Sequence, residues 1–550
     1  DQFLANLINM IDSMIENYSE ADIHNMMSYN PDLAISPLSR ETLQMDNQVF
    51  LGAKAYYLKK LVSYGLPVPT GFVLTTEVYR HKETIYKHPY MRLELENLIL
   101  KHIKEMERSE KLEFGSTTRP MLLSVRSGTA ISMPGAMSTF LNVGMNDAVA
   151  EALGKNPETA WMGWDSYRRF IQSWGMSHGV DRDLFDEVMA RYKQKYGVDR
   201  KSDFTAEQMK ELAQEYKKIL NENGVFIDDN PLVQLKQAIN NVFDSWSSKR
   251  AIAYRKHLQV ADEWGTAVVV QKMVMGNRSK RSGSGVVFTR NPKLKKPGIN
   301  LYGDFTLCSQ GEDIVAGLVY TMPISESQRQ DDYHDCEISL ESAFPQIYRR
   351  LYEIAIELIE QHGFNHQEIE FTFESEDPKD LYLLQIKEQN IVHKEMAIFS
   401  TPVEEMVLIG KGIGAGGGCL SGIVSFDMDD LLHNKEKYPT EHHILIRPDT
   451  VPDDIQMIFM CDGLVTSRGG VTSHAAVTAE KLGKVCVVNC KELVVHDRKK
   501  QCKINEFIVK TGDAISIDGL VGSIYLGKYP VSTNSFNFAP EKLQSIARRI

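Results

Sequence analysis

The stretch Thr466–Val477, TSRGGVTSHAAV, decides how the C-terminal part of this 550-residue chain folds. Gly469 and Gly470 permit positive φ angles and a close approach of the backbone to another group. Small apolar residues follow His474, so the pattern predicts a closely packed helix that begins near this histidine. A histidine in the first turn of a helix lies beside backbone N–H groups and the positive end of the helix dipole. That position suits a phosphoryl group.

The residues around this histidine favour the same chemistry. Thr472 and Ser473 are of types that cap helices, and Arg468 can add a charge-assisted contact to a phosphate. Neutral imidazole is a nucleophile near pH 7, and a phosphorylated imidazole keeps enough transfer potential to pass the phosphate onward. A single histidine at a helix start is more often incidental. The whole twelve-residue string, with its structural context, predicts a phosphate carrier at His474.

A second group of residues lies in the N-terminal part of the chain. Lys54 follows Gly52 near a predicted helix start, and Arg126 stands at the end of an apolar strand. A loop rich in small residues, 132–139, comes next. An Arg at a strand end beside such a loop is what a phosphate cradle needs. The chain lacks GxxxxGK[ST], so this is not a Walker loop, and an isolated Lys would more often be a solvated surface charge.

Two carboxylates and an amide predict a cation site. Glu368 and Glu370 are two apart on a predicted strand, so their side chains share one face of it. Gln385 lies on another predicted strand. Carboxylate, amide and phosphate oxygens together suit Mg²⁺, although a strand Glu is more often a surface residue.

The chain is too long for a single hydrophobic core and is predicted to contain several domains. Residues 46–395 form one mixed α/β unit with a helix-rich, charged insertion over about 145–230. Residues 396–407 are a linker, 408–530 form a small second α/β domain, and 531–550 start a connector. The fold class is therefore α/β with α+β character.

The strand predictions come from short apolar runs, and the helix predictions from 3.6-residue periodicity. The strands are 71–74, 121–125, 267–274, 285–288, 368–374 and 381–386 in the first unit, and 423–426, 444–446, 485–488, 514–517 and 523–526 in the second. The principal helices are 205–220 and 348–362.

Residues 1–45 are predicted to be a separate helical extension. Asn30-Pro31 and Ser36-Pro37 mark turns that follow the helix. Its apolar residues share one helical face: Leu4, Leu7, Ile8, Ile11 and Ile15. A packing helix is the plain interpretation, and a docking helix or the tail of an upstream region is the alternative.

Composition restricts the partners. The net charge of −11 argues against a nucleic-acid binder, and no apolar run is long enough to cross a bilayer. The N-terminus shows no secretory signal pattern. The seven cysteines are scattered without a CxxC pair, which favours free thiols in a reducing compartment over zinc ligation. The expectation is a cytoplasmic protein that binds neither nucleic acid nor a membrane.

The string around His474 resembles the phosphohistidine loop of the PEP-utilising enzymes, a family that includes the pyruvate phosphate dikinases. Ile446–Ile455 and Gly483–Val488 match in position on either side of it. The N-terminal part resembles the ATP-grasp domain of pyruvate phosphate dikinases over nearly its whole length. The strings that carry this resemblance are Val125–Gly128, Ser132–Gly135, Asp165–Phe170, Arg250–Arg255, Phe288–Pro292 and Gln310–Asp313.

The resemblance implies an ATP-grasp domain followed by a swivelling phosphohistidine domain. It also implies an Mg²⁺-dependent reaction in which ATP, inorganic phosphate and pyruvate give AMP, diphosphate and phosphoenolpyruvate (PEP). In this family a C-terminal barrel binds pyruvate and PEP, and the chain stops at Ile550, about where the connector to that barrel would begin. The barrel would be missing or separate. A homodimer is compatible with the resemblance.

The resemblance also carries roles to matching residues. The ATP- and phosphate-binding residues are Lys54, Arg126, Gly135, Met137, Thr139, Gln271, Met273, Met275, Glu312 and Gln385. The metal-binding residues are Glu368, Glu370 and Gln385. The phosphohistidine loop comprises Arg468, Gly469, Gly470, Thr472 and Ser473, with His474 as the catalytic nucleophile. Thr472 also matches a regulatory phosphorylation site of plant members.

The chain departs from the family pattern at several positions. Glu368 stands where the family has Asp, Lys387 and Glu480 stand where it has Arg, and 415–418 reads AGGG in place of ASPG. Two alternatives therefore stay open beside the pyruvate reaction. One is a phosphotransferase with a different acceptor, such as a sugar polymer, an antibiotic or a protein. The other is a non-catalytic nucleotide-binding regulatory module.

Overall fold

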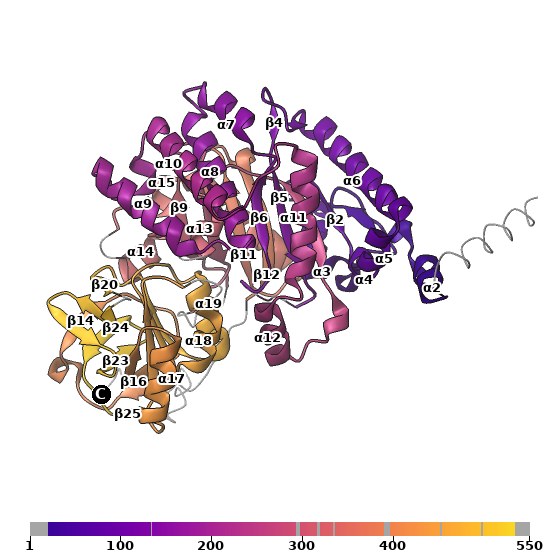
Figure 1. The fold of residues 1–550 in the computed structure, drawn as a ribbon. Coiled ribbons are helices and arrows are strands. Elements are labelled where there is room, and N and C mark those ends of the chain that lie inside the picture. The colour runs from indigo at the N-terminus through magenta and orange to yellow at the C-terminus, as the bar shows by residue number, and fades with distance from the viewer. Residues whose placement is uncertain are drawn as a thin grey trace, which may run out of the picture. The chain divides into compact units, whose positions relative to one another are not determined.

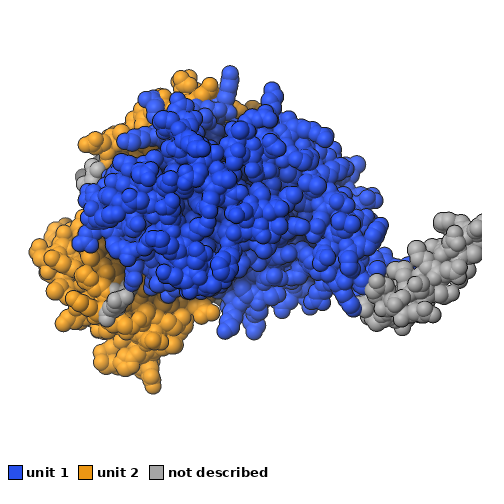
Figure 2. Space-filling model, turned by 45° about the horizontal axis from the view of Figure 1, so that its top comes forward, with its two compact units in different colours: residues 1–282, 372–375, 379–387 blue, residues 283–371, 376–378, 388–550 orange. Residues whose placement is uncertain are grey.

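The computed structural model describes residues 20–131, 133, 135–292, 298–315, 319–333, 336–389, 397–450, 454–496 and 499–533. The chain divides into two compact units (Figure 2). Unit 1 comprises residues 1–282, 372–375 and 379–387, and unit 2 comprises 283–371, 376–378 and 388–550. The predicted helix over Leu4–Ile15 and the connector beyond residue 533 lie outside the described residues.

Unit 1 is built on a five-stranded antiparallel sheet with the order β1-β2-β7-β5-β6 (Figure 1). Its strands are β1 (Ile35–Pro37), β2 (Gly71–Leu74), β5 (Leu123–Gly128), β6 (Thr139–Val143) and β7 (Ala267–Lys272). A short parallel pair, β3 (Glu113–Phe114) and β4 (Pro120–Met121), stands apart, and β12 (Leu381–Glu388) returns to this unit late in the chain.

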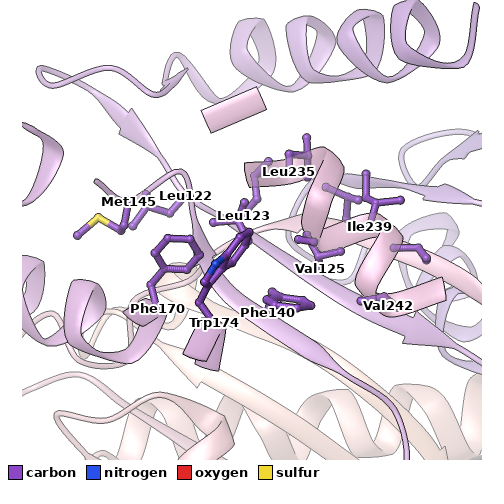
Figure 3. Packing of buried hydrophobic residues seen from close by; sticks show 14 of the residues in the cluster. Leu122, Leu123, Val125, Phe140, Met145, Phe170, Trp174, Leu235, Ile239 and Val242 are labelled. Atoms are coloured by element: carbon purple, nitrogen blue, oxygen red, sulfur yellow. The ribbon is translucent and has the colours of Figure 1, made fainter. Parts of the chain in front are cut away.

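Helices surround the sheet of unit 1. They are α2 (Glu20–Ser28), α3 (Gln48–Ser63), α4 (Thr76–Arg80), α5 (Lys82–Lys87), α6 (Pro89–Glu110), α7 (Asp147–Gly154), α8 (Ala160–Ser177), α9 (Arg182–Tyr196), α10 (Ala206–Glu222), α11 (Pro231–Ser245) and α12 (Lys249–Leu258). The insertion predicted to be helix-rich contains α7 to α10. α8 and α11 contact β6, and their apolar faces meet the sheet in the core shown in Figure 3. There the Phe140 and Trp174 rings meet edge to face, 5.6 Å between centroids.

Unit 2 contains two larger sheets. Four of its strands are ordered β10-β9-β8-β11, namely β10 (Met322–Pro323), β9 (Tyr302–Leu307), β8 (Gly283–Phe288) and β11 (Gln367–Phe373). The helices of this part are α13 (Gly311–Val315), α14 (Glu326–Asp332), α15 (Leu340–Ala343) and α16 (Pro345–Ile356), which continues as a π-helical turn over Glu357–Gln361.

The second sheet of unit 2 has eight strands in the order β14-β24-β23-β16-β17-β18-β19-β15. These are β14 (Leu408–Lys411), β15 (Ile413–Gly414), β16 (Cys419–Ser425), β17 (His443–Arg447), β18 (Gly463–Thr466), β19 (Val485–Val488), β23 (Ala514–Asp518) and β24 (Ser523–Leu526). The central strands β16 to β19 are parallel. The helices α17 (Met428–Lys437), α18 (Ile455–Met460) and α19 (His474–Leu482) connect them in turn.

Two smaller sheets complete unit 2. One is the antiparallel sheet of β20 (Leu493–His496), β21 (Gln501–Ile504) and β22 (Phe507–Lys510), and the other pairs β13 (Ala397–Phe399) with β25 (Val531–Thr533). The mixture of helices with parallel and antiparallel strands confirms the predicted fold class. All seven cysteines are free thiols, and in the described residues no helix is long and apolar enough to cross a membrane.

Candidate functional site

The histidine loop connects β18 to α19, at the carboxyl end of a parallel strand, where open α/β sheets commonly bind ligands. The loop is tied down at its start, because the Ser467 hydroxyl donates to the Pro448 carbonyl over 2.8 Å. Gly469 has φ +89°, a conformation that favours glycine. Ser473 caps the helix by accepting from the Ala476 N–H, and His474 is the first residue of α19. The prediction that His474 lies in the first helical turn is confirmed.

A carboxylate from a distant strand holds this loop. Asp304, on β9, accepts hydrogen bonds at 2.8 Å from both the backbone N–H and the hydroxyl of Thr472. Its other oxygen accepts from the hydroxyls of Thr321 and Tyr333. Both Asp304 and Thr472 are buried. The loop is therefore attached to β9 through one side chain.

Gly470 belongs to the loop for a reason that the sequence pattern did not reveal. A Cβ atom at this position would lie 2.3 Å from the carboxylate carbon and from both oxygens of Asp304. That is roughly 1.2 Å closer than an optimal carbon contact of about 3.5 Å. Glycine at this position leaves room for the Asp304 carboxylate.

The four groups that donate to Asp304 are neutral, and the carboxylate is fully buried. Burial raises the pKa of Asp304, and its hydrogen bonds from Tyr333, Thr472 and Thr321 oppose that shift without cancelling it. A buried carboxylate whose charge is only partly compensated makes a directional attachment of modest net strength.

In unit 1, Lys54 lies where the sequence predicted a helix start. Gly52 has φ +71° and ψ 164°, so α3 is interrupted there and resumes at the next residue. The N–H of Ala53 donates to the Thr129 carbonyl over 2.9 Å, which joins this helix start to the loop after β5. A Cβ on Gly52 would lie 2.2 Å from the Gly128 carbonyl oxygen. Lys54 thus stands in the first turn of a helix that touches the loop after β5.

Arg126 is held from two sides within unit 1. Its Nη2 donates to the Gln271 amide oxygen at 2.5 Å and to the Leu384 carbonyl at 3.2 Å. The Gln271 amide nitrogen in turn donates to the Pro69 carbonyl at 3.1 Å, and Gln271 is buried. The family resemblance implies that Gln271 binds ATP. Its side chain in this structure positions Arg126.

The small-residue loop ends beside Arg126. Arg126 pairs with Thr139 across β5 and β6, and Gly135 has φ +67°. Ser245 on α11 accepts from the Ser138 N–H at 3.1 Å and lies 3.8 Å from the Met137 sulfur. The loop is thereby attached to α11 at its C-terminal end. The predicted loop residues Ser132 and Pro134 lie outside the described residues.

The remaining predicted ligands of unit 1 lie on adjoining segments. β7 ends at Lys272, two residues before the predicted strand end at residue 274. Met273 and Met275 follow the strand, and both are partly buried against the core. The Met275 N–H donates to the Glu374 carboxylate at 2.8 Å. Gln385 is the residue after Leu384, whose carbonyl accepts from Arg126. Unit 1 therefore brings Lys54, the loop, Arg126 and Gln385 onto connected segments.

The acidic residues predicted to bind metal lie in unit 2. Glu368 and Glu370 alternate along β11 with the fully buried Ile369 and Phe371, so they share the opposite face of the strand. Glu312 is exposed on α13. No group of three or more His, Cys, Asp or Glu suited to a metal occurs among the described residues. Two carboxylates on one strand face fit Mg²⁺ nonetheless, because this ion is commonly held by one or two carboxylates together with substrate phosphates.

Comparison with known families assigns both parts of the chain. Residues 82–342 match the AMP/ATP-binding domain of pyruvate phosphate dikinase, and residues 439–522 match the mobile domain of PEP-utilising enzymes. The second match contains His474 and its loop. These two domains are those of the pyruvate phosphate dikinase family.

Individual members of that family are similar over most of the chain. Proteins named pyruvate, phosphate dikinase from Clostridium symbiosum and from Rickettsia typhi are each 34% identical to it, over 90% and 88% of the chain respectively. The one from Entamoeba histolytica is 36% identical over 88% of the chain. The chain spans 58%, 57% and 56% of these three relatives. The similarity therefore covers the nucleotide-binding and mobile domains and leaves over two fifths of each relative unmatched.

Proposed function

We propose that the protein is an ATP-dependent phosphotransferase that is phosphorylated on His474 and passes the phosphoryl group to a second acceptor. The observation that carries this proposal is the position of His474. It begins α19, directly after a loop that Asp304 holds and that falls in the matched mobile domain. A neutral imidazole beside the N-terminus of a helix combines a nucleophile with backbone N–H groups that favour a phosphate.

The proposed half-reaction conserves every phosphoryl group. The β-phosphoryl of ATP goes to the imidazole nitrogen of His474, with cleavage of its bond to the AMP oxygen. The γ-phosphoryl goes to inorganic phosphate and gives diphosphate, with cleavage of the bond from the γ-phosphorus to the oxygen that joins it to the β-phosphoryl group, and the imidazole proton is released. Lys54 and Arg126 would neutralise charge on the triphosphate, and the loop over Gly135–Thr139 would lie along it.

Mg²⁺ would be held by Glu368 and Glu370 together with phosphate oxygens, and Gln385 would bind phosphate and support the ion. A bound Mg²⁺ supplies compensation of the charge that develops on the transferring phosphate. Within the chain itself, Gln271 and the Leu384 carbonyl keep Arg126 in place for the triphosphate.

Labelling from ATP tests this proposal. The chain is incubated with Mg²⁺, inorganic phosphate and ATP labelled at the β-phosphate, and acid-labile label on protein is measured beside AMP release. We expect label on the wild type and none on His474→Ala. Absence of label on the wild type, or equal label on both proteins, would reject the proposal. AMP formation above the His474→Ala level would also exclude the alternative of a non-catalytic module, which Glu368, Lys387 and Glu480 had kept open.

The second acceptor is proposed to be pyruvate, which would yield PEP when a barrel domain is joined to this chain. The names of the relatives support pyruvate, and the unmatched part of those relatives leaves room for such a domain. The labelled protein is mixed with unlabelled pyruvate and with the part of a relative that this chain does not match, and the position of the label is then measured. Label recovered in PEP supports pyruvate. Label that stays on His474 under these conditions favours a different acceptor.

Thr472 is proposed as a site at which phosphorylation would regulate the loop. Its hydroxyl is buried and donates to Asp304, so a kinase could reach it only after the loop leaves β9. A phosphate on Thr472 would then be repelled by the Asp304 carboxylate and would prevent the loop from returning. A Thr472→Glu variant that kept normal labelling of His474 would contradict this proposal.

A further inference from the structure

α6 presents an apolar stripe that nothing in the described residues covers. Tyr90, Leu93 and Leu100 are 75%, 57% and 38% exposed. Their spacing places them along one side of this 22-residue helix, with Asn97 between the last two. The opposite side of α6 packs against the core through buried residues such as Leu95 and Ile99. In Figure 1 α6 runs along the outside of unit 1.

The most exposed charges around this stripe are basic. The exposed charged side chains of α6 are Arg92, Lys101, Lys104 and Arg108. The glutamates of the helix are all less exposed, and Glu107 forms an ion pair of 2.6 Å with Lys104. The outer surface of α6 is thus apolar and basic, although the whole chain carries a net charge of −11. Such a surface fits an acidic amphipathic helix.

The N-terminal nineteen residues of the chain have that composition. They contain Asp1, Asp12 and Glu16 and no Lys, Arg or His, and apolar residues at helical spacing run from Leu4 to Ile15. Nineteen helical residues span about 28 Å, and the 22 residues of α6 span about 33 Å. An acidic helix also has little affinity for anionic membranes, which attract basic faces.

The path of the chain leads from this segment to the start of α6. The segment joins α2 at Glu20, α2 contacts α5, and α5 contacts α6. Just beyond α2, burial raises the pKa of the Tyr29 phenol, and Glu94 in the second turn of α6 is near enough to raise it further. The N–H of Asn30 donates to Glu77 at 3.1 Å, which fixes the chain at that point.

We propose that residues 1–19 dock as an amphipathic helix on the apolar and basic face of α6 in the same chain, through Tyr90, Leu93 and Leu100 and through Lys101 and Lys104. The occupant is this segment because it joins the chain at α2, which is linked to α6 through α5, and because it carries the complementary charge. Tethering makes the contact intramolecular, so a small apolar contact suffices to populate it. This proposal is independent of the phosphotransfer reaction.

Zero-length carbodiimide coupling tests the contact directly, because it joins carboxylates to amines only when they touch. We expect peptides that link Asp12 or Glu16 to Lys101 or Lys104. The reaction is run on a mixture of ¹⁴N- and ¹⁵N-labelled chains. Links within one isotope support the proposal, and links of mixed isotope would overturn it in favour of a second copy on this face.

Hydrogen exchange provides a second test of the proposed contact. We expect amides of residues 4–16 to exchange about tenfold or more slowly in the wild type than in the double variant Leu93→Asp, Leu100→Asp. The matched control is Leu432→Asp on α17, where the leucine is 50% exposed and belongs to unit 2. Protection of α6 itself must persist in the double variant. Equal exchange in wild type and double variant, or no links within one chain, overturns the proposal.

Discussion

Replacing Gly470 by Ala should break the attachment between the histidine loop and β9. The new Cβ would lie 2.3 Å from three atoms of the Asp304 carboxylate, so either the loop or the carboxylate must move by about 1 Å. Overpacking of a buried site costs about 1–3 kcal/mol. Movement would also weaken hydrogen bonds to Asp304, and each buried donor left unsatisfied costs about 1–3 kcal/mol. We expect Gly470→Ala to lower the free energy of unfolding of unit 2 by about 2–5 kcal/mol.

The same substitution should be nearly harmless once the carboxylate is gone. In an Asp304→Ala background the clash is absent, and Gly470 is not among the positive-φ glycines. There Gly470→Ala should change stability by less than about 1 kcal/mol. The double-mutant cycle should therefore show a coupling of about 2 kcal/mol or more. Gly469→Ala is the matched control, because φ +89° strains an alanine equally in both backgrounds.

Urea unfolding distinguishes the two units in one experiment. All five tryptophans lie between residues 161 and 264 and so report unit 1. Far-ultraviolet circular dichroism follows both units, and tryptophan fluorescence should show an unchanged unit 1 transition. Two results would refute the steric account of this loop. One is a loss of unfolding free energy on Gly470→Ala that is the same with and without Asp304, and the other is a shift of the tryptophan transition.

Three further predictions concern Gly52, Gln271 and the pKa of Asp304. Gly52→Ala should destabilise unit 1 by at least about 1 kcal/mol more than Gly65→Ala, measured by tryptophan fluorescence in urea. Both glycines have positive φ, but only at Gly52 would a Cβ meet backbone, so equal costs would contradict the close approach. Gln271→Leu removes an acceptor of Arg126 and should raise the Kd for ATP about tenfold by calorimetry, and an unchanged Kd would contradict its positioning role. Burial raises the pKa of Asp304 in the folded protein above its ordinary value of 3.8. The stability that Asp304 contributes is therefore complete when the pH is below 3.8, and it is lost as the pH rises through the pKa of the folded state. The stability difference between wild type and Asp304→Ala should therefore shrink as pH rises from about 4 to 8, and a constant difference would rule that shift out.

Local sequence patterns predicted the elements around the site. The helix start at His474 follows from a capping Ser and a run of small apolar residues, and the structure has α19 beginning there. The interruption at Gly52 follows from a glycine before a helical run. Each of these depends on residues within a few positions of one another, where dihedral preferences and capping decide the conformation.

The contacts that hold the site could not be predicted in the same way. Asp304 and Thr472 are 168 residues apart, and Arg126 and Gln271 are 145 apart. No periodicity or capping rule joins such residues, because the fold of the whole unit brings them together. One local signal was present: Asp304 is the only acidic residue in the apolar run of β9 (Tyr302–Leu307). If a carboxylate in such a strand is buried, it needs hydrogen-bond donors from other parts of the chain.

The character of the Asp304 contact bears on how a phosphate carrier would work. If His474 is loaded at one place and discharged at another, its loop must be able to leave β9. A carboxylate paired with Arg or Lys at this position would hold the loop through a buried ion pair, and separating such a pair costs about 3–5 kcal/mol. Asp304 instead accepts from three hydroxyls and one N–H, and the cost of burying its charge offsets much of what those bonds contribute. Four hydrogen bonds and the space that Gly470 leaves then fix the orientation of the loop. Release of the loop from β9 nevertheless needs little free energy, because exposure to water restores the hydration of the Asp304 carboxylate.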